Sequence, residues 1–271
     1  MIVRRLILKN WRNFREVDVH LRERVFIVGP NASGKSNFLD IFRFLRDITK
    51  TGGGLQEAVS IRGGISKMRC LSARSKSDIE IEIHLSEEPT SRITWRYALG
   101  ITQTGGGVFK TRAKLKYEKV WDKDENLLCN RPDAKDETDD KLLEYTFLEQ
   151  PNANSKFREI ATFLQGIQYL HVLPQLIRDP KSFINASNED DYFGRDLIER
   201  INRTNVNTRK AYLRRVEAAL RQAVPQFREL QLIKDEMGIP HLQAIYQHWR
   251  PSGAKQREDQ FSDGTLRLIG F

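Results

Sequence analysis

The chain has 271 residues and a formal net charge of +9, with 39% hydrophobic and 30% charged residues. No apolar run approaches the roughly 20 residues of a membrane-spanning helix, and the N-terminus lacks the apolar region and cleavage site of a secretion signal. The sequence therefore predicts neither a membrane-spanning helix nor a secretion signal. Cys70 and Cys129 fit no metal spacing, which predicts reduced thiols in a cytoplasmic protein. The positive charge fits either a solvated surface or a polyanionic partner such as nucleic acid.

The first part of the chain predicts two strands, a third strand, a loop and a helix. Residues 1–21 alternate apolar and polar side chains on both sides of a turn at 10–14. The apolar run 24–28 predicts a buried strand, and residues 37–48 repeat apolar side chains at helical spacing. Between them, residues 29–36 read GPNASGKS, which has the G-x-x-x-x-G-K-S spacing of a P-loop.

This loop carries a specific chemical prediction. A strand, a glycine-bearing turn and a helix place backbone N–H groups and a helix N-terminus around one anion. We predict that Lys35 reaches the β- and γ-phosphates of a nucleotide and that the Ser36 hydroxyl helps to hold Mg²⁺.

The middle of the chain predicts a short helix at 55–61 and then an antiparallel meander. Its strands are expected at 78–85, 92–101 and 108–121. Residues 122–140 are rich in charge, and Asp139 and Asp140 at their end fit a solvated loop better than a metal site. Residues 142–148 fit a strand or a helix equally well.

A helix is expected at 157–166, followed by a buried strand at 167–173. Gln175 comes directly after that strand. A glutamine in this place can reach into a nucleotide site and coordinate Mg²⁺ or the attacking water, although alone it fits a surface residue better.

Residues 193–222 predict a pair of helices with a break at 204–208. The expected apolar face of the second helix consists of Tyr212, Val216, Leu220 and Ala223. Basic residues also gather here, among them Arg209, Lys210, Arg214 and Arg215. Either a polyanion or a protein partner would fit them.

The last part of the chain predicts a hairpin and a helix start. Strands are expected at 229–233 and 241–249, and a polar loop at 251–259. Residues 262–265 read SDGT ahead of an apolar helical run, which is an N-cap signature.

Together these motifs resemble the ABC-type P-loop ATPases, and in particular their SMC and RecF-like branch with the OLD-type and related bacterial AAA defence ATPases. Four segments carry the resemblance. They are LKNWRNF at 8–14, VGPNASGKSNFLDIFRFL at 28–45, YLHVLPQLI at 169–177 and QFSDGTLRLIGF at 260–271.

The resemblance implies an α/β fold, a single ATPase head with a mixed sheet, an antiparallel meander and a helical lobe. Its expected parts are a P-loop and β lobe at 1–150, a Q-loop strand, helical lobe and hairpin at 151–258, and the start of the signature helix at 259–271.

The resemblance also implies which residues bind ATP and Mg²⁺. Lys35 and the Q-loop glutamine, Gln175, would be catalytic, and Ser36 and Gln175 would bind the metal. Ser262 and Gly264 would contact the γ-phosphate of a nucleotide held by a second subunit, so the resemblance implies a homodimer around an ATP sandwich. The remaining nucleotide contacts would come from Arg12, Gly29, Asn31, Ala32, Ser33, Gly34 and Asn37.

One element of the family is missing. A Walker B strand, apolar and ending in two carboxylates, is expected shortly after the signature helix, yet nothing before Phe271 qualifies. The nearest run, at 230–236, is interrupted by Gln231 and Lys234. We therefore expect a part of a longer protein, in which residues 1–271 bind ATP but hydrolyse it poorly.

The predicted function is an ATP-binding and ATP-hydrolysing head that dimerises around ATP. It would act in antiphage defence with a nuclease or toxin partner, in contact with DNA and without a membrane. Two alternatives stay open: a DNA repair or recombination ATPase, and a scaffold that binds nucleotide without hydrolysing it.

Overall fold

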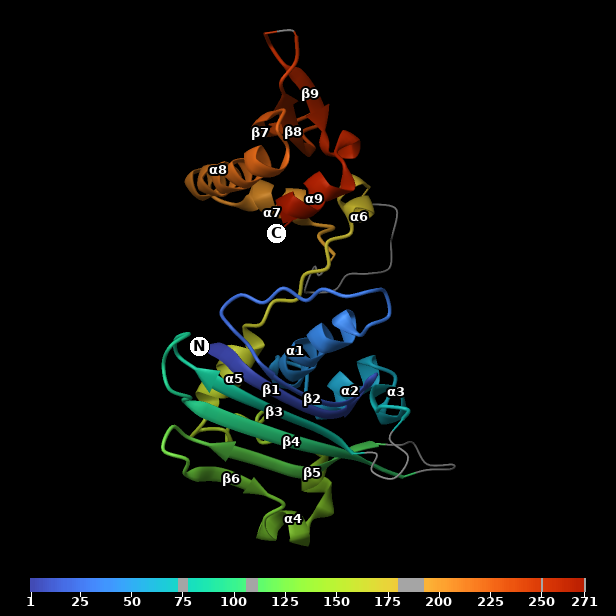
Figure 1. Cartoon of the computed structure of the whole chain (residues 1–271), viewed down its shortest axis with the longest axis vertical. Coiled ribbons are helices and arrows are strands. Elements are labelled where there is room, and N and C mark those ends of the chain that lie inside the picture. The colour runs from blue at the N-terminus through green and yellow to red at the C-terminus, as the bar shows by residue number, and fades with distance from the viewer. Residues whose placement is uncertain (73–77, 106–111, 180–192, 250, 271) are drawn as a thin grey trace. The chain divides into compact units, whose positions relative to one another are not determined.

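The computed structural model divides the chain into two compact units, Met1–Gln168 and Tyr169–Phe271 (Figure 1). The residues that the structure describes are 1–72, 78–105, 112–179, 193–249 and 251–270.

A six-stranded antiparallel sheet forms the first unit, in the order β2-β1-β3-β4-β5-β6. The alternation of apolar and polar residues explains why these segments form strands with one buried face. In β3, for example, every second residue of IEIEIHLS is buried. The predicted hairpin and meander are confirmed, and the expected beginning of the last meander strand, 108–111, lies outside the described residues. The strands are β1 (Ile2–Trp11), β2 (Phe14–His20), β3 (Ile79–Ser86), β4 (Trp95–Thr104), β5 (Arg112–Trp121) and β6 (Leu127–Arg131).

Helices cover the apolar side of this sheet. The fully buried side chains of Ile41, Phe44 and Leu45 in α1 join Leu6 and Leu8 of β1 in one core cluster. Each such side chain contributes about 1.5–3 kcal/mol when it leaves water. The helices of the first unit are α1 (Lys35–Thr49), α2 (Leu55–Ile61), α3 (Ile65–Met68), α4 (Ala134–Thr138), the 3₁₀ helix η1 (Asp140–Glu144) and α5 (Arg158–Gln165).

The charged segment before η1 has a structural role. The Asp139 side chain accepts a hydrogen bond from the backbone N–H of Lys141 at 3.1 Å and so caps η1. Asp140 forms an ion pair with Lys114. Among the described residues, no group of three or more His, Cys, Asp and Glu side chains could hold a metal ion.

The second unit builds a smaller sheet, β7-β8-β9, which is also antiparallel. Leu220, Leu242 and Leu266 lie at the centre of its own apolar cluster and are fully buried. In the described part of the chain, no helix is long and apolar enough to cross a bilayer. The elements are α6 (Pro174–Arg178), α7 (Leu197–Arg203), α8 (Val206–Ala223), β7 (Phe227–Lys234), β8 (Pro240–Tyr246), β9 (Ala254–Arg257), the 3₁₀ helix η2 (Glu258–Gln260) and α9 (Asp263–Gly270).

Two of the predicted buried strands are wrong. Residues 24–28 are not a strand, and Phe26 and Val28 are 90% and 88% exposed. Residues 167–173 are not a strand either, and Leu170 is 41% exposed. Both runs are apolar enough, but a strand also needs a neighbour that accepts and donates backbone hydrogen bonds. The described residues offer neither run such a neighbour.

Two smaller expectations also need correction. The segment 251–259 is not a loop throughout, because β9 pairs with β8. Its polar sequence AKQR is typical of an edge strand. In α8, Tyr212 is 54% exposed and Ala223 is also exposed, while Leu213 packs on the core instead.

Candidate nucleotide-binding site

The P-loop motif forms the connection into α1, as predicted. Gly34 caps the helix with φ +98°, in the left-handed region that glycine favours. A Cβ atom at Gly34 would lie 2.4 Å from Nδ2 of Asn13 and 2.8 Å from Cζ of Phe14. Both distances are too short for a Cβ contact, so a larger residue at Gly34 would have to displace the side chains of Asn13 and Phe14.

Lys35 folds back over the loop that precedes it. Its Nζ donates hydrogen bonds to the carbonyl oxygens of Gly29 at 2.8 Å and Pro30 at 2.7 Å. The ammonium group is therefore held at the loop by acceptors that carry only partial charge. A phosphate group offers a full negative charge to the same donors.

The first turn of α1 presents free backbone donors. The first helical bond runs from the N–H of Phe38 to the carbonyl of Gly34 at 2.8 Å. Within the described residues, no acceptor bonds the N–H groups of Lys35 and Ser36, as expected at a helix start. These donors and the helix dipole favour an anion, and the exposed Ser36 hydroxyl stands beside them. The residues present thus fit a phosphate group with its magnesium ion.

The β1–β2 turn is clamped onto the loop by Asn13. Asn37 Nδ2 donates to Asn13 Oδ1 at 2.8 Å, and Asn13 Nδ2 approaches the carbonyl of Ser33 at 3.5 Å. Trp11 Nε1 donates to the carbonyl of Asn37 at 2.9 Å. Sequence reasoning placed Asn13 in the turn, where it was expected with Arg12 to approach the nucleotide if these strands flank the P-loop, and missed its contacts with Ser33 and Asn37. The asparagine at the hairpin tip was the available signal.

Arg12 lies in the same turn with its side chain directed to α1 and α3. Its Nη2 donates to Asp40 Oδ2 at 3.3 Å, and its Nη1 donates to the carbonyl of Lys67 at 3.2 Å. Its Nε is buried without a hydrogen-bond partner. Arg12 is therefore anchored beside the loop, and its contact with nucleotide stays a prediction.

A buried ion network holds α1 in place behind the loop. Arg62 donates to Asp40 at 2.9 Å and 3.0 Å and to Asp47 at 2.9 Å. The side chains of Arg62 and Asp47 are each only 4% exposed. Buried charges are tolerated when they are paired and hydrogen-bonded. This network, which the sequence did not indicate, ties α1 to the end of α2.

The other predicted site residues lie in the second unit. Ser262 caps α9, as predicted, because its Oγ accepts the N–H of Thr265 at 3.2 Å. Gln175 is exposed on α6. Arg178, on the same helix, donates to Asp263 Oδ1 and the carbonyl of Phe261, both at 2.6 Å. The structure therefore ties the glutamine's helix to the start of the predicted signature helix.

Gly264 is exposed in the first turn of α9, where a Cβ would meet only Ser262 Oγ at 3.9 Å. The described contacts of this unit leave room for a larger residue. Packing within this unit therefore does not require glycine at position 264. The predicted contact of Gly264 with the nucleotide of a second subunit stays a prediction.

The run 230–236 belongs to an antiparallel hairpin. Asp235 accepts the N–H groups of Met237 at 3.0 Å and Ile239 at 2.8 Å, so its carboxylate caps the turn between β7 and β8. The expectation that this run sits in a hairpin is confirmed.

The loop, its glycine and the open helix turn define a P-loop nucleotide-binding protein. Residues 24–271 match the family described as "AAA domain, putative AbiEii toxin, Type IV TA system", and the chain belongs to this family. The predicted resemblance to ABC-type P-loop ATPases of the SMC and RecF-like branch is thereby confirmed.

The further similarities include one relative and one solved structure. The DNA replication and repair protein RecF of Lactobacillus johnsonii (strain CNCM I-12250 / La1 / NCC 533) is 36% identical over 90 residues, which are 32% of this chain and 24% of RecF. This chain thus covers about a quarter of RecF. The crystal structure of the SmcHead bound to the C-winged helix domain of ScpA is 17% identical, with a TM-score of 0.48, over 100% of this chain and 74% of that chain.

Proposed function

We propose that this protein is an ATPase head that binds ATP and Mg²⁺ through its P-loop and dimerises around the nucleotide. The observation that carries the proposal is the loop itself, where Lys35 Nζ is bonded only to the carbonyl oxygens of Gly29 and Pro30 and, among the described residues, the N–H groups of Lys35 and Ser36 have no acceptor. The residues that would hold ATP and its metal are Arg12, Gly29, Asn31, Ala32, Ser33, Gly34, Lys35, Ser36 and Asn37, joined by Gln175 for the metal.

In this proposal the chain's own residues bind and orient the phosphates. Lys35 exchanges two carbonyl partners for phosphate oxygens, and the first-turn N–H groups donate to the same group. When bound, ATP supplies a cleavable γ-phosphate, which is the energy source of the cycle. Ser262 and Gly264 of one chain complete the site of a second chain, so that nucleotide state controls association.

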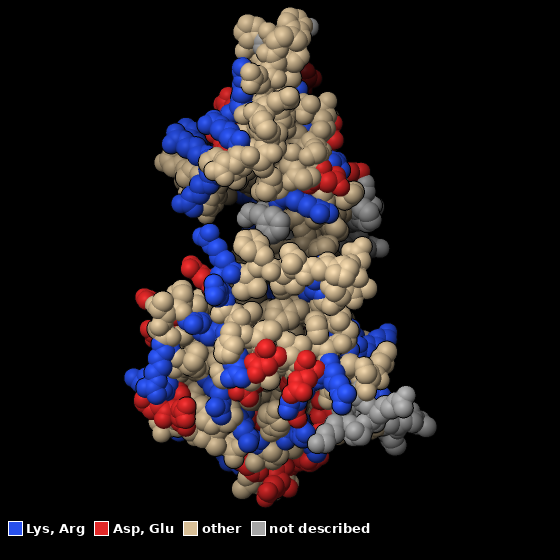
Figure 2. All heavy atoms as spheres, in the orientation of Figure 1, with Lys and Arg blue, Asp and Glu red and all other residues tan. Residues whose placement is uncertain are grey.

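We place this head in antiphage defence, acting with a nuclease or toxin partner. The family description, with its toxin and Type IV TA system, supports this assignment. The stretch that is similar to a DNA replication and repair protein supports a repair ATPase as the second candidate. Exposed Lys210, Arg214 and Arg215 on α8 favour contact with DNA in both cases. Figure 2 shows the basic side chains gathered there.

Nucleotide binding is tested by calorimetric titration of ATP with Mg²⁺. Lys35→Ala removes the ammonium group and should abolish measurable binding. Lys141→Ala, on the exposed surface of η1, is the matched control and should bind as the unaltered chain does. Unchanged affinity in Lys35→Ala would remove the P-loop assignment.

Dimerisation is tested by light scattering with and without ATP. Ser262→Arg should keep ATP binding and lose the ATP-dependent dimer, whereas Ser252→Arg in the exposed turn before β9 should keep both. A dimer that persists in Ser262→Arg contradicts the signature role. Hydrolysis of ATP is measured separately. If the protein hydrolyses ATP and Lys35→Ala abolishes this activity, the alternative of a non-hydrolysing scaffold is excluded.

A further inference from the structure

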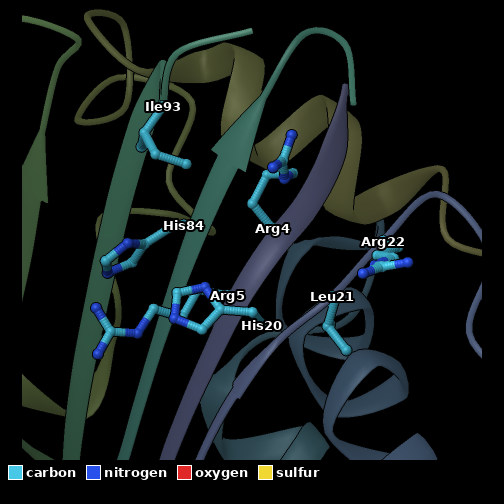
Figure 3. A pocket seen from close by; sticks show the side chains of 7 residues that line it. All are labelled: Arg4, Arg5, His20, Leu21, Arg22, His84 and Ile93. Carbon is cyan, nitrogen blue, oxygen red and sulfur yellow. The ribbon is translucent and has the colours of Figure 1, made fainter. Parts of the chain in front are cut away.

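A cavity of about 420 Å³ opens at one end of the six-stranded sheet, and the P-loop residues take no part in it. Figure 3 shows its side chains, which come from β1, β3, the end of β2 and the segments beside them. Of the described residues, no carboxylate lines the cavity. Its polar lining is basic and consists of Arg4, Arg5, His20, Arg22 and His84.

Strand register places several of these side chains in one row. His20 lies opposite Arg5, Arg5 lies opposite His84, and His84 lies opposite Arg96. Each opposed pair therefore joins a guanidinium to an imidazole, and the row gathers basic side chains at one end of the sheet.

Carboxylates of the sheet pair with three members of this row, namely Arg5, His84 and Arg96. Asp18 accepts two hydrogen bonds from Arg5, at 2.7 Å and 2.6 Å. Glu82 is hydrogen-bonded to His84 at 2.7 Å, which lowers the pKa of that carboxyl group. Both carboxylates lie two positions along their strands from the basic row, outside the cavity lining.

The remaining basic groups lack acceptors. Within the described part of the chain, the side chains of Arg4, His20 and Arg22 make no hydrogen bond or ion pair. Nη1 of Arg4 is moreover buried, beside the irregularity of β1 between Val3 and Arg5. The guanidinium of Arg4, a lining residue of the cavity, therefore has donor capacity that no group in the described part of the chain uses.

We propose that this cavity binds the phosphate group of a small organic molecule. Arg4 and Arg22 supply the guanidinium donors, whose planar fork matches phosphate oxygens. Leu21 and Ile93 supply an apolar wall for the rest of the ligand. The volume of about 420 Å³ falls within the range of small-molecule sites. A concave site of this size favours a small ligand over the extended backbone of DNA.

The test uses inorganic phosphate and pyrophosphate as probes, titrated calorimetrically into the full chain carrying Lys35→Ala. This background removes the P-loop lysine, so that binding reports the basic cavity. Pyrophosphate should bind saturably, and Arg22→Gln should weaken it roughly tenfold or more. Arg22 is exposed and outside any strand, so this variant keeps the fold, while Arg4→Gln tests the buried donor separately.

Arg15→Gln is the matched control, because Arg15 is exposed on β2 and does not line the cavity. It should keep pyrophosphate affinity within about twofold. Absence of binding by both probes, or an equal loss in the Arg15 variant, overturns the proposal. A DNA duplex that binds through Arg22 while pyrophosphate does not would overturn the small-molecule assignment as well. The Lys35→Ala background already removes ATP binding through the P-loop. A failure of the basic cavity to bind pyrophosphate is therefore distinguished from a failure of the P-loop to bind ATP.

Discussion

Replacing Gly34 with alanine tests how the hairpin shapes the phosphate site. The new Cβ would lie 2.4 Å from Asn13 Nδ2 at a backbone φ of +98°. The left-handed conformation costs an alanine about 1–2 kcal/mol. Displacing Asn13 also breaks its hydrogen bond with Asn37, which is worth about 1 kcal/mol. The loop geometry should therefore be disfavoured by about 2–3 kcal/mol, which corresponds to roughly 30- to 150-fold weaker ATP binding.

Gly52→Ala is the control for backbone strain. Gly52 also has a positive φ, +71°, but a Cβ there would meet no atom within 4 Å. This variant should lose about 1–2 kcal/mol of stability and keep its ATP affinity. Affinity is measured by calorimetry and stability by urea unfolding. Equal ATP affinity in the Gly34 and Gly52 variants would refute the steric reasoning.

Three more predictions concern the rest of the chain. Burial raises the pKa of Glu149 to about 7, although its Oε2 accepts the N–H of Leu55 at 2.6 Å. The unfolding free energy should therefore fall by up to about 3 kcal/mol as pH rises from the ordinary value of 4.5 through 7; carboxyl NMR with a midpoint near pH 4.5 would contradict this. Arg62→Ala removes the hydrogen bonds from Arg62 to Asp40 and Asp47, which keep Arg12 and Arg46 as partners, and should cost about 1.5–3 kcal/mol in urea unfolding, whereas a loss below about 1 kcal/mol would make the network dispensable. Charge reversal of Arg214 and Arg215 should weaken DNA binding and flatten its salt dependence; an unaltered slope would assign both to a protein contact.

Local periodicity predicted most of the fold because it acts within a few residues. Strict alternation identified β3, and helical spacing identified α1 and α5. The same logic failed at 24–28 and 167–173, where apolar composition is present but the described residues supply no pairing strand. Strand formation depends on a distant neighbour, which a single run of sequence does not contain.

The candidate site shows the same division. The spacing of the P-loop motif predicted the loop and the start of α1 directly. The contacts between Asn13 and Asn37, and between Arg62 and Asp40, join residues more than twenty positions apart. No short motif encodes them, because they arise only when the hairpin and the α2 turn pack on α1.

Those distant contacts decide where the phosphate site lies. Inside the loop, the structure records only the weak bond from the N–H of Ser33 to the carbonyl of Pro30, at 3.3 Å, and the two bonds of Lys35. The lysine bonds must break when phosphate binds, so they cannot fix the loop in the bound state. Trp11 and Asn13 hold the helix start from the sheet and need not move. The β1–β2 turn therefore fixes the position of the helix start. Substitutions in this turn should weaken nucleotide binding as strongly as substitutions in the P-loop motif.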